Sequence, residues 1–185
     1  MKIRIFLQIL VLFSSIFMLA GCSLLLPAVK NVNYYDLNYS GKERYKVKCR
    51  FEMRNFHNIS PARLNLMYSK KDSVVEIDQY NYWVQSPEIM LRRFLLNAME
   101  PVSDANEKFL DASLTVFDFK FDTAAKEAVL GVHLVLKDKE REAKFEKNYI
   151  FRVPVSNSDR EAYVAAMNKC AEKFVIQTIN DIKKF

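Results

Sequence analysis

The sequence predicts an α+β domain: a mostly antiparallel sheet with two helices packed on one face, the second helix long and C-terminal. Apolar and polar residues alternate with a period of two in several segments between residues 45 and 153, which indicates strands. Residues 86–99 and 158–183 instead repeat at helical spacing. The 185 residues, 50% of them hydrophobic and with a net charge of +6, suit one ordinary globular domain.

The first half of the domain predicts four strands. Residues 34–39 form a short aromatic strand, and Gly41 turns the chain after it. Residues 45–54 alternate most regularly, with apolar side chains on one face and mainly charged ones on the other, so a single half-buried strand is expected there. Two further strands, around 64–68 and from 75 onward, are separated by the turn at 70–72 and are expected to pair antiparallel.

A helix is predicted to begin at Ser86. Ser86 is a favourable N-cap, Pro87 suits the first helical position, and Glu88 places a carboxylate near the positive end of the helix dipole. An apolar face continues to Met99, and Pro101 ends the helix.

Three long strands are expected after this helix. Residues 110–116 alternate in one phase and residues 117–121 in the opposite phase, so one inserted residue near Val116 and Phe117 predicts a β-bulge. Residues 128–136 and 145–153 give two more strands, joined by a charged turn at 137–142. A long amphipathic helix then runs from Ser158, in the capping box Ser-Asp-Arg-Glu, to about Lys183.

The composition argues against the common catalytic and cofactor sites. The three glycines are isolated, so no phosphate-binding glycine loop is present. His57 and His133 have no Cys or His at ligand spacing and no nucleophile in an activating pattern. We therefore expect no catalytic residue, no metal, no cofactor and no nucleic-acid partner.

The N-terminus has the features of a secretory signal peptide. Lys2 and Arg4 supply its positive charge, and a mostly apolar run from Ile5 to Met18 follows. This run is shorter than the roughly 20 apolar residues of a spanning helix.

The residues Leu19-Ala20-Gly21-Cys22 resemble the bacterial lipobox. That resemblance implies that the Cys22 thiol receives a diacylglycerol, that the chain is cleaved before Cys22, and that Cys22 becomes the acylated first residue, with palmitate-type chains. The alternative is an ordinary signal peptide with a coincidental cysteine. The expected organisation is a signal peptide at 1–21, an acylated tether at 22–33 and a single domain at 34–185. Ser23 after the cysteine favours the outer membrane over the inner membrane.

Four features occur in the order seen in a known lipoprotein family: the lipobox, the strand Tyr35-Asp36-Leu37, the segment Tyr80-Asn81-Tyr82-Trp83 followed by Ser86-Pro87, and the long C-terminal helix. The chain thus resembles the ABC-type transport auxiliary lipoproteins of the paraquat-inducible protein C type.

The resemblance implies a non-enzymatic periplasmic subunit of a phospholipid transport system that also contains an ATPase, a permease and a substrate-binding protein of the mammalian-cell-entry (MCE) type. Its partners would be the membrane, through acylated Cys22, and the MCE-type protein. The alternative function is an outer-membrane assembly lipoprotein that plugs or chaperones a β-barrel, as in lipopolysaccharide export.

Two residue-level questions stay open from the sequence. Tyr80, Tyr82 and Trp83 are either core aromatics or an exposed anchor for a partner protein.

Cys49 and Cys170 both lie on apolar faces, in a compartment expected to be oxidising. They either form a disulfide or stay two separate buried thiols, because spacing in sequence does not give the distance between them.

Overall fold

The computed structural model describes residues 30–41, 44–47, 50–60, 63–70, 74–101, 109–157 and 159–183. The chain divides into two compact units, Met1–Asn31 and Val32–Phe185, and all the elements below belong to the second unit.

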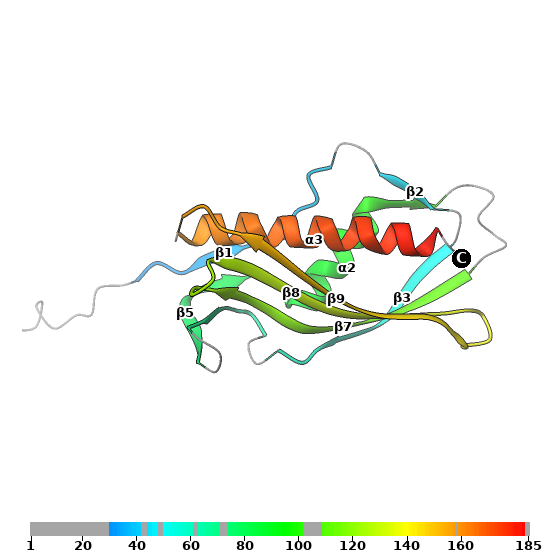
Figure 1. Ribbon diagram of the computed structural model, residues 1–185, viewed down its shortest axis with the longest axis horizontal. Coiled ribbons are helices and arrows are strands. Elements are labelled where there is room, and N and C mark those ends of the chain that lie inside the picture. The colour runs from blue at the N-terminus through cyan, green and yellow to red at the C-terminus, as the bar shows by residue number, and fades with distance from the viewer. Residues whose placement is uncertain are drawn as a thin grey trace, which may run out of the picture. The chain divides into compact units, whose positions relative to one another are not determined.

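Three long antiparallel strands form the centre of the sheet. They are β7 (Phe109–Asp122), β8 (Glu127–Lys137) and β9 (Ala143–Pro154), which pair in chain order (Figure 1). Alternate residues of β7 from Leu110 to Val116 are buried because successive side chains of a strand point to opposite faces. The expected strands and the charged turn between β8 and β9 are confirmed.

The free edge of β7 is covered by two shorter strands. Strand β3 (Arg50–Asn58) pairs with its first half, and β4 (Asn65–Ser69) pairs with its end, both in parallel. Strand β4 then pairs antiparallel with β5 (Val75–Trp83), as expected, and β1 (Asn33–Tyr35) pairs parallel with the end of β5. The sheet order is therefore β1-β5-β4-β7-β8-β9, with β3 beside β7.

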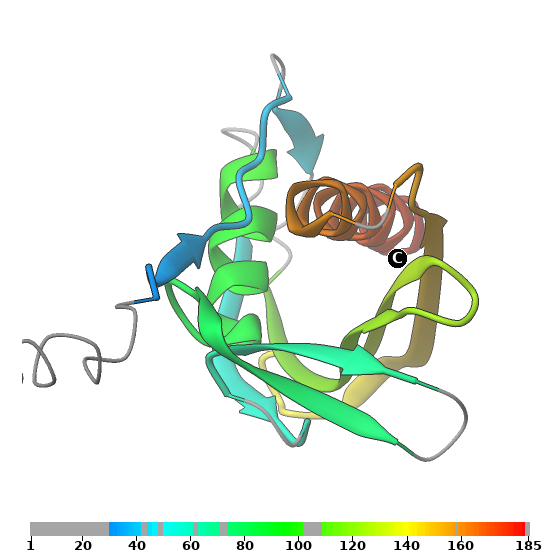
Figure 2. The ribbon, with the colours of Figure 1, turned by 90° about the vertical axis from the view of Figure 1, so that its left-hand side faces the viewer.

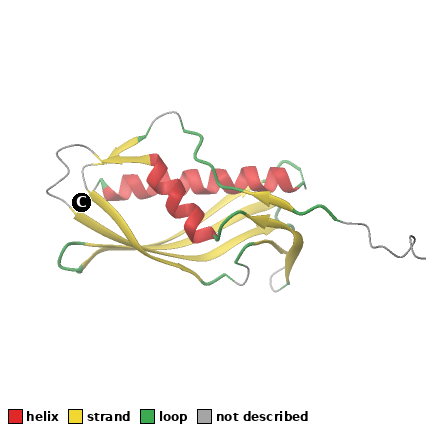
Figure 3. Ribbon diagram, turned by 180° about the vertical axis from the view of Figure 1, so that it is seen from behind, coloured by secondary structure: helices red, strands yellow, loops and turns green. Residues whose placement is uncertain are grey.

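Two helices pack on one face of this sheet. Helix α2 (Pro87–Ala98) contacts β3 and β7, whereas α3 (Arg160–Ile182) contacts β8 and β9, and the two helices also contact each other (Figures 2 and 3). Buried side chains fill the space between the layers, among them Phe94 of α2, Phe121 of β7 and Phe174 of α3. The predicted α+β fold with a mostly antiparallel sheet and a long C-terminal helix is confirmed.

The β-bulge predicted near Val116 and Phe117 is present. The register between β7 and β8 shifts between Val116 and Asp118. Phe117 lies over Gly131 of β8, where an added Cβ atom would overlap the phenyl ring. Glycine at this position therefore leaves room for the ring of the inserted residue.

Two local predictions were wrong. The regular alternation of residues 45–54 does not form one strand: β2 (Tyr45–Val47) pairs with β6 (Met99–Pro101) in a separate two-stranded sheet, whereas β3 begins at Arg50 in the large sheet. The N-cap of α3 is Asp159, whose carboxylate accepts a hydrogen bond from the Ala162 N–H at 2.7 Å. Ser158, the predicted N-cap, lies outside the described residues.

Candidate functional site

The segment that follows the predicted tether is fixed to three elements of the domain. We call residues 33–39 the N-terminal clasp. Tyr35 pairs with Trp83 of β5, and its hydroxyl donates to the Glu161 carboxylate of α3 at 3.2 Å. Asp36 forms an ion pair with Arg93 of α2. The next residue, Leu37, is only 1% exposed and packs in the core.

The rest of the clasp makes further contacts with both helices. The Asn38 backbone N–H donates to the side-chain oxygen of Asn168 in α3 at 2.9 Å, and the Asn168 amide in turn donates to the Val164 carbonyl. The Tyr39 ring meets Phe94 of α2 edge-on, with 5.5 Å between ring centroids. The clasp therefore attaches the chain after Asn33 to the edge of the sheet and to both helices, so a force on the upstream chain would be transmitted to all three elements.

A buried carboxylate, Asp78, joins β5 to the start of α3. One of its oxygens accepts the backbone N–H groups of Tyr80 and Asn81, and the other accepts the Asn81 amide and lies 3.2 Å from the Arg160 Nε. The Asp78 backbone carbonyl accepts from Asn65 of β4, where the β4–β5 register shifts. Asp78 thus shapes an irregular turn of β5 and attaches α3 to it.

The surroundings of Asp78 favour its charged form. Burial raises the pKa of this carboxyl, but the hydrogen bonds from Tyr80, Asn81 and Arg160 outweigh burial and hold the pKa below its ordinary value. A depressed carboxyl pKa means that ionised Asp78 stabilises the folded state. This network could not be predicted from the sequence pattern, because a lone acid in an alternating strand usually faces solvent.

Trp83 is part of the core. Its side chain is 2% exposed. The indole ring packs edge-on against Phe119, with 5.1 Å between ring centroids, and in a tilted arrangement against Phe121, with 6.1 Å between centroids. Of the two alternatives for this residue, the structure supports the core aromatic, and an exposed Trp83 anchor is wrong. Tyr82 is half-buried, whereas Tyr80 is 37% exposed, so these two remain candidates for contact with a partner.

The three cysteines cannot be compared in the structure, because Cys22 and Cys49 lie outside the described residues. Cys170 is a free, buried thiol that donates to the Ala128 carbonyl at 3.4 Å. Burial raises its pKa to about 12, so the thiol is neutral and unreactive at neutral pH. Acylation of Cys22 stays a prediction, and so do both alternatives for Cys49 and Cys170, a disulfide or two separate buried thiols, because Cys49 is not described.

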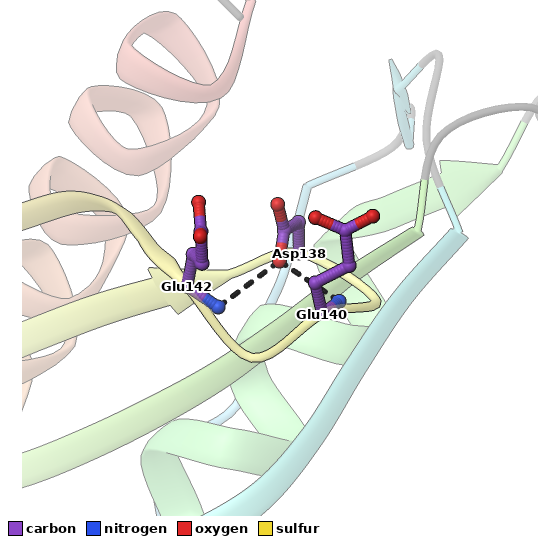
Figure 4. A group of neighbouring side chains, drawn as sticks. All are labelled: Asp138, Glu140 and Glu142. Carbon is purple, nitrogen blue, oxygen red and sulfur yellow. Dashed lines mark hydrogen bonds between the residues drawn. The ribbon is translucent and has the colours of Figure 1, made fainter.

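Three acidic side chains meet in the turn between β8 and β9, Asp138, Glu140 and Glu142 (Figure 4). Asp138 accepts the backbone N–H groups of Glu140 and Glu142, so it holds the turn together. Lys144 lies 3.1 Å from Asp138 and 2.7 Å from Glu142, and it offsets part of the negative charge of the three acids. The hydrogen bonds of the turn account for the position of the Asp138 carboxylate.

The two histidines lie on different strands. His133 of β8 faces Glu146 of β9, with 3.0 Å between Nε2 and the carboxylate, and His57 of β3 is exposed.

Neither helix within the described residues is long and apolar enough to cross a bilayer.

Comparison with known proteins gives a fold likeness. No family model matches the chain, and no curated protein sequence matches it significantly. Two solved structures are similar in fold. The first, an uncharacterized protein, has a TM-score of 0.65 and 13% identity over 83% of this chain and 99% of that chain. The second is protein XCC0632 from Xanthomonas campestris, described with the family model DUF330. Its TM-score is 0.60, with 14% identity over 83% of this chain and 90% of that chain. At these identities the likeness shows the shared fold.

Proposed function

We propose that this protein is a non-enzymatic, lipid-anchored subunit of an ABC/MCE-type phospholipid transport system, held by acylated Cys22 at the outer membrane and facing the periplasm. In this role the domain anchors or assembles the periplasmic part of the transporter. The lipobox and the ordered family motifs in the sequence are the basis of the proposal.

One structural observation supports it above the others. The Tyr35-Asp36-Leu37 motif and the segment that ends at Trp83 lie far apart in sequence, yet Tyr35 and Trp83 are directly paired in the sheet. The Val84 N–H donates to the Tyr35 carbonyl at 2.9 Å, and Asp36 pairs with Arg93 in the helix that Ser86 and Pro87 begin. Two of the four features that carry the resemblance, the Tyr35-Asp36-Leu37 strand and the segment from Tyr80 to Pro87, therefore form one structural unit, which is unexpected for chance matches.

Crosslinking from intact cells tests the proposal. A C-terminally tagged chain, crosslinked through its surface lysines and purified from membranes, is expected to capture an MCE-type protein. The Cys22→Ser variant is the control, because without the anchor the same domain loses its place beside the transporter. Capture of a large outer-membrane β-barrel instead would support the assembly-lipoprotein alternative, and capture of neither would contradict the proposal.

A further inference from the structure

Exposed apolar side chains concentrate on and beside the two strands β1 and β5 at one edge of the sheet. Among the described residues thirteen large hydrophobic side chains are exposed, and eight of them lie in the short segments 32–34 and 74–89. Seven belong to the paired strands β1 and β5 or lie next to them. We call the six of these that precede Asn81 the edge patch: Val32, Tyr34, Val74, Val75, Ile77 and Tyr80.

The edge patch lies on a strand that is only partly covered. Strand β1 pairs with Asn81–Trp83 alone, so among the described strands none pairs with the outer edge of β5 from Val75 to Gln79. Figure 2 looks onto this end of the domain, where the β4–β5 hairpin crosses the front. An uncovered apolar edge usually serves as a contact surface or invites aggregation.

We propose that the edge patch lies on the phospholipid surface that holds the acyl chains of Cys22, so that the domain docks on its own membrane with a fixed orientation. This inference depends on the anchoring part of the proposed function. It assigns the uncovered edge of β5 to lipid headgroups and the upper acyl chains.

The length of the tether supports a lipid surface as the occupant. Ten residues lie between Cys22 and Asn33, and the eleven steps from one Cα atom to the next span at most about 36 Å even when fully extended. Strand β5 itself is nine residues long, or about 30 Å. A domain attached at β1 by so short a chain holds β1, and the end of β5 that pairs with it, within about 36 Å of the bilayer.

The chemistry of the edge patch also suits the interface of a bilayer. Tyrosines are enriched at this depth because the ring is apolar while the hydroxyl reaches water, and Tyr34 and Tyr82 lie side by side with ring centroids 5.8 Å apart. Both acidic residues of β5 are in ion pairs, Glu76 with Lys70 and Asp78 with Arg160. No uncompensated acid of this strand therefore repels anionic headgroups.

The open edge also limits how deeply the domain sits. Unpaired backbone N–H and C=O groups do not enter the hydrocarbon, where no water satisfies them. The backbone of β5 must stay at headgroup level, so only the side chains reach the upper acyl chains. Docking is expected to be shallow and, because the contacts are apolar, weakly dependent on salt.

Depth-dependent quenching tests the proposal on the full lipoprotein. The acylated chain, reconstituted in vesicles of phosphatidylethanolamine and phosphatidylglycerol, carries Ile77→Trp or, as the matched control, Ile150→Trp. Ile150 is also an exposed strand isoleucine, but it lies on β9 at the opposite edge of the sheet. Bromine atoms high on the acyl chains are expected to quench the Ile77→Trp emission above the parent signal, and deep bromines less. The Ile150→Trp emission is expected to stay unquenched.

Equal quenching at the two positions, or none at Ile77, would overturn the proposal. Protection of the Ile77→Trp side chain from acrylamide in native membranes but not in pure lipid vesicles would also overturn it, because a protein would then cover the edge. A mass measurement that finds no acyl chain on Cys22 removes the anchor and the docking together. Quenching at Ile77 without capture of an MCE-type protein would leave the docking standing and reject the transporter role alone.

Discussion

At the scale of single residues, Trp83 shows how packing decides a role that the sequence leaves open. The pattern before Ser86 suits either a core strand or an exposed aromatic anchor, because the rings that bury Trp83 come from β7, more than 30 residues later. Periodicity within a segment carries no information on such distant neighbours. The position of the strand was therefore predictable, whereas the burial of its last residue was not.

We predict that Trp83→Ala destabilises the domain by about 3–5 kcal/mol, because it removes a large buried ring and leaves a cavity beside Phe119. Tyr34→Ala is the control: this aromatic residue is 67% exposed, and its truncation is expected to cost less than about 1 kcal/mol. Chemical denaturation of both variants measures the difference. Equal free energies of unfolding would contradict the burial of Trp83.

Gly131 is a second residue whose environment sets the tolerated side chain. We predict that Gly131→Ala costs about 1–3 kcal/mol, because the new methyl group overlaps the Phe117 ring and lies near the Asp118 Cβ. Phe117→Ala in the same chain removes the overlap, so the cost of Gly131→Ala should be smaller in that background. A double-mutant cycle by denaturation checks this, and additive costs would count against it.

At the scale of elements, the sequence predicted the strands that pair locally better than those that pair at a distance. The β7 bulge was visible because the alternation changes phase within one strand. The division of residues 45–54 was not visible, because β2 pairs with β6 and β3 with β7, and both pairings are parallel and far apart in sequence. Because apolar and polar residues alternate without a break from residue 45 to residue 54, the pattern does not show that the chain passes from one sheet to another within this segment.

The attachment of α3 to β5 predicts a dependence of stability on pH. Since the pKa of folded Asp78 lies below its ordinary value of 3.8, its ionised form stabilises the fold at neutral pH, and this contribution is lost as pH falls through the folded pKa. The Asp78→Asn variant should therefore lose less free energy of unfolding than the parent when the solution is acidified below pH 3.8. Denaturation curves at several acidic pH values measure this slope.

A carboxylate in an exposed turn gives the matched control for this experiment. Glu140→Gln removes one acid from the turn between β8 and β9, on a different element from Asp78. If Asp78→Asn and Glu140→Gln changed the slope equally, the stabilising role of the Arg160 contact would be refuted.

At the scale of the whole molecule, the anchor and the domain are expected to be separable. We predict that Cys22→Ser abolishes lipid attachment while the thermal melting temperature of the domain stays unchanged, because the core of residues 32–185 is built without Cys22. Metabolic labelling with a fatty acid and cell fractionation test the first part, and a thermal melt tests the second. Label retained in the Ser variant would refute acylation at Cys22.

The clasp also bears on the order in which the chain completes its fold. Tyr35 and Asn38 are bound by residues of α3 that follow them by 126 and 130 positions. If the chain is exported as proposed, the clasp crosses the inner membrane early and the helix that locks it crosses last. Until α3 had emerged, the segment beside Cys22 would lack those contacts, and the cysteine would be free to meet the enzymes that the proposed acylation requires. Closure of the domain would then follow processing, so the last step of folding fixes a chain end that already carries its lipid.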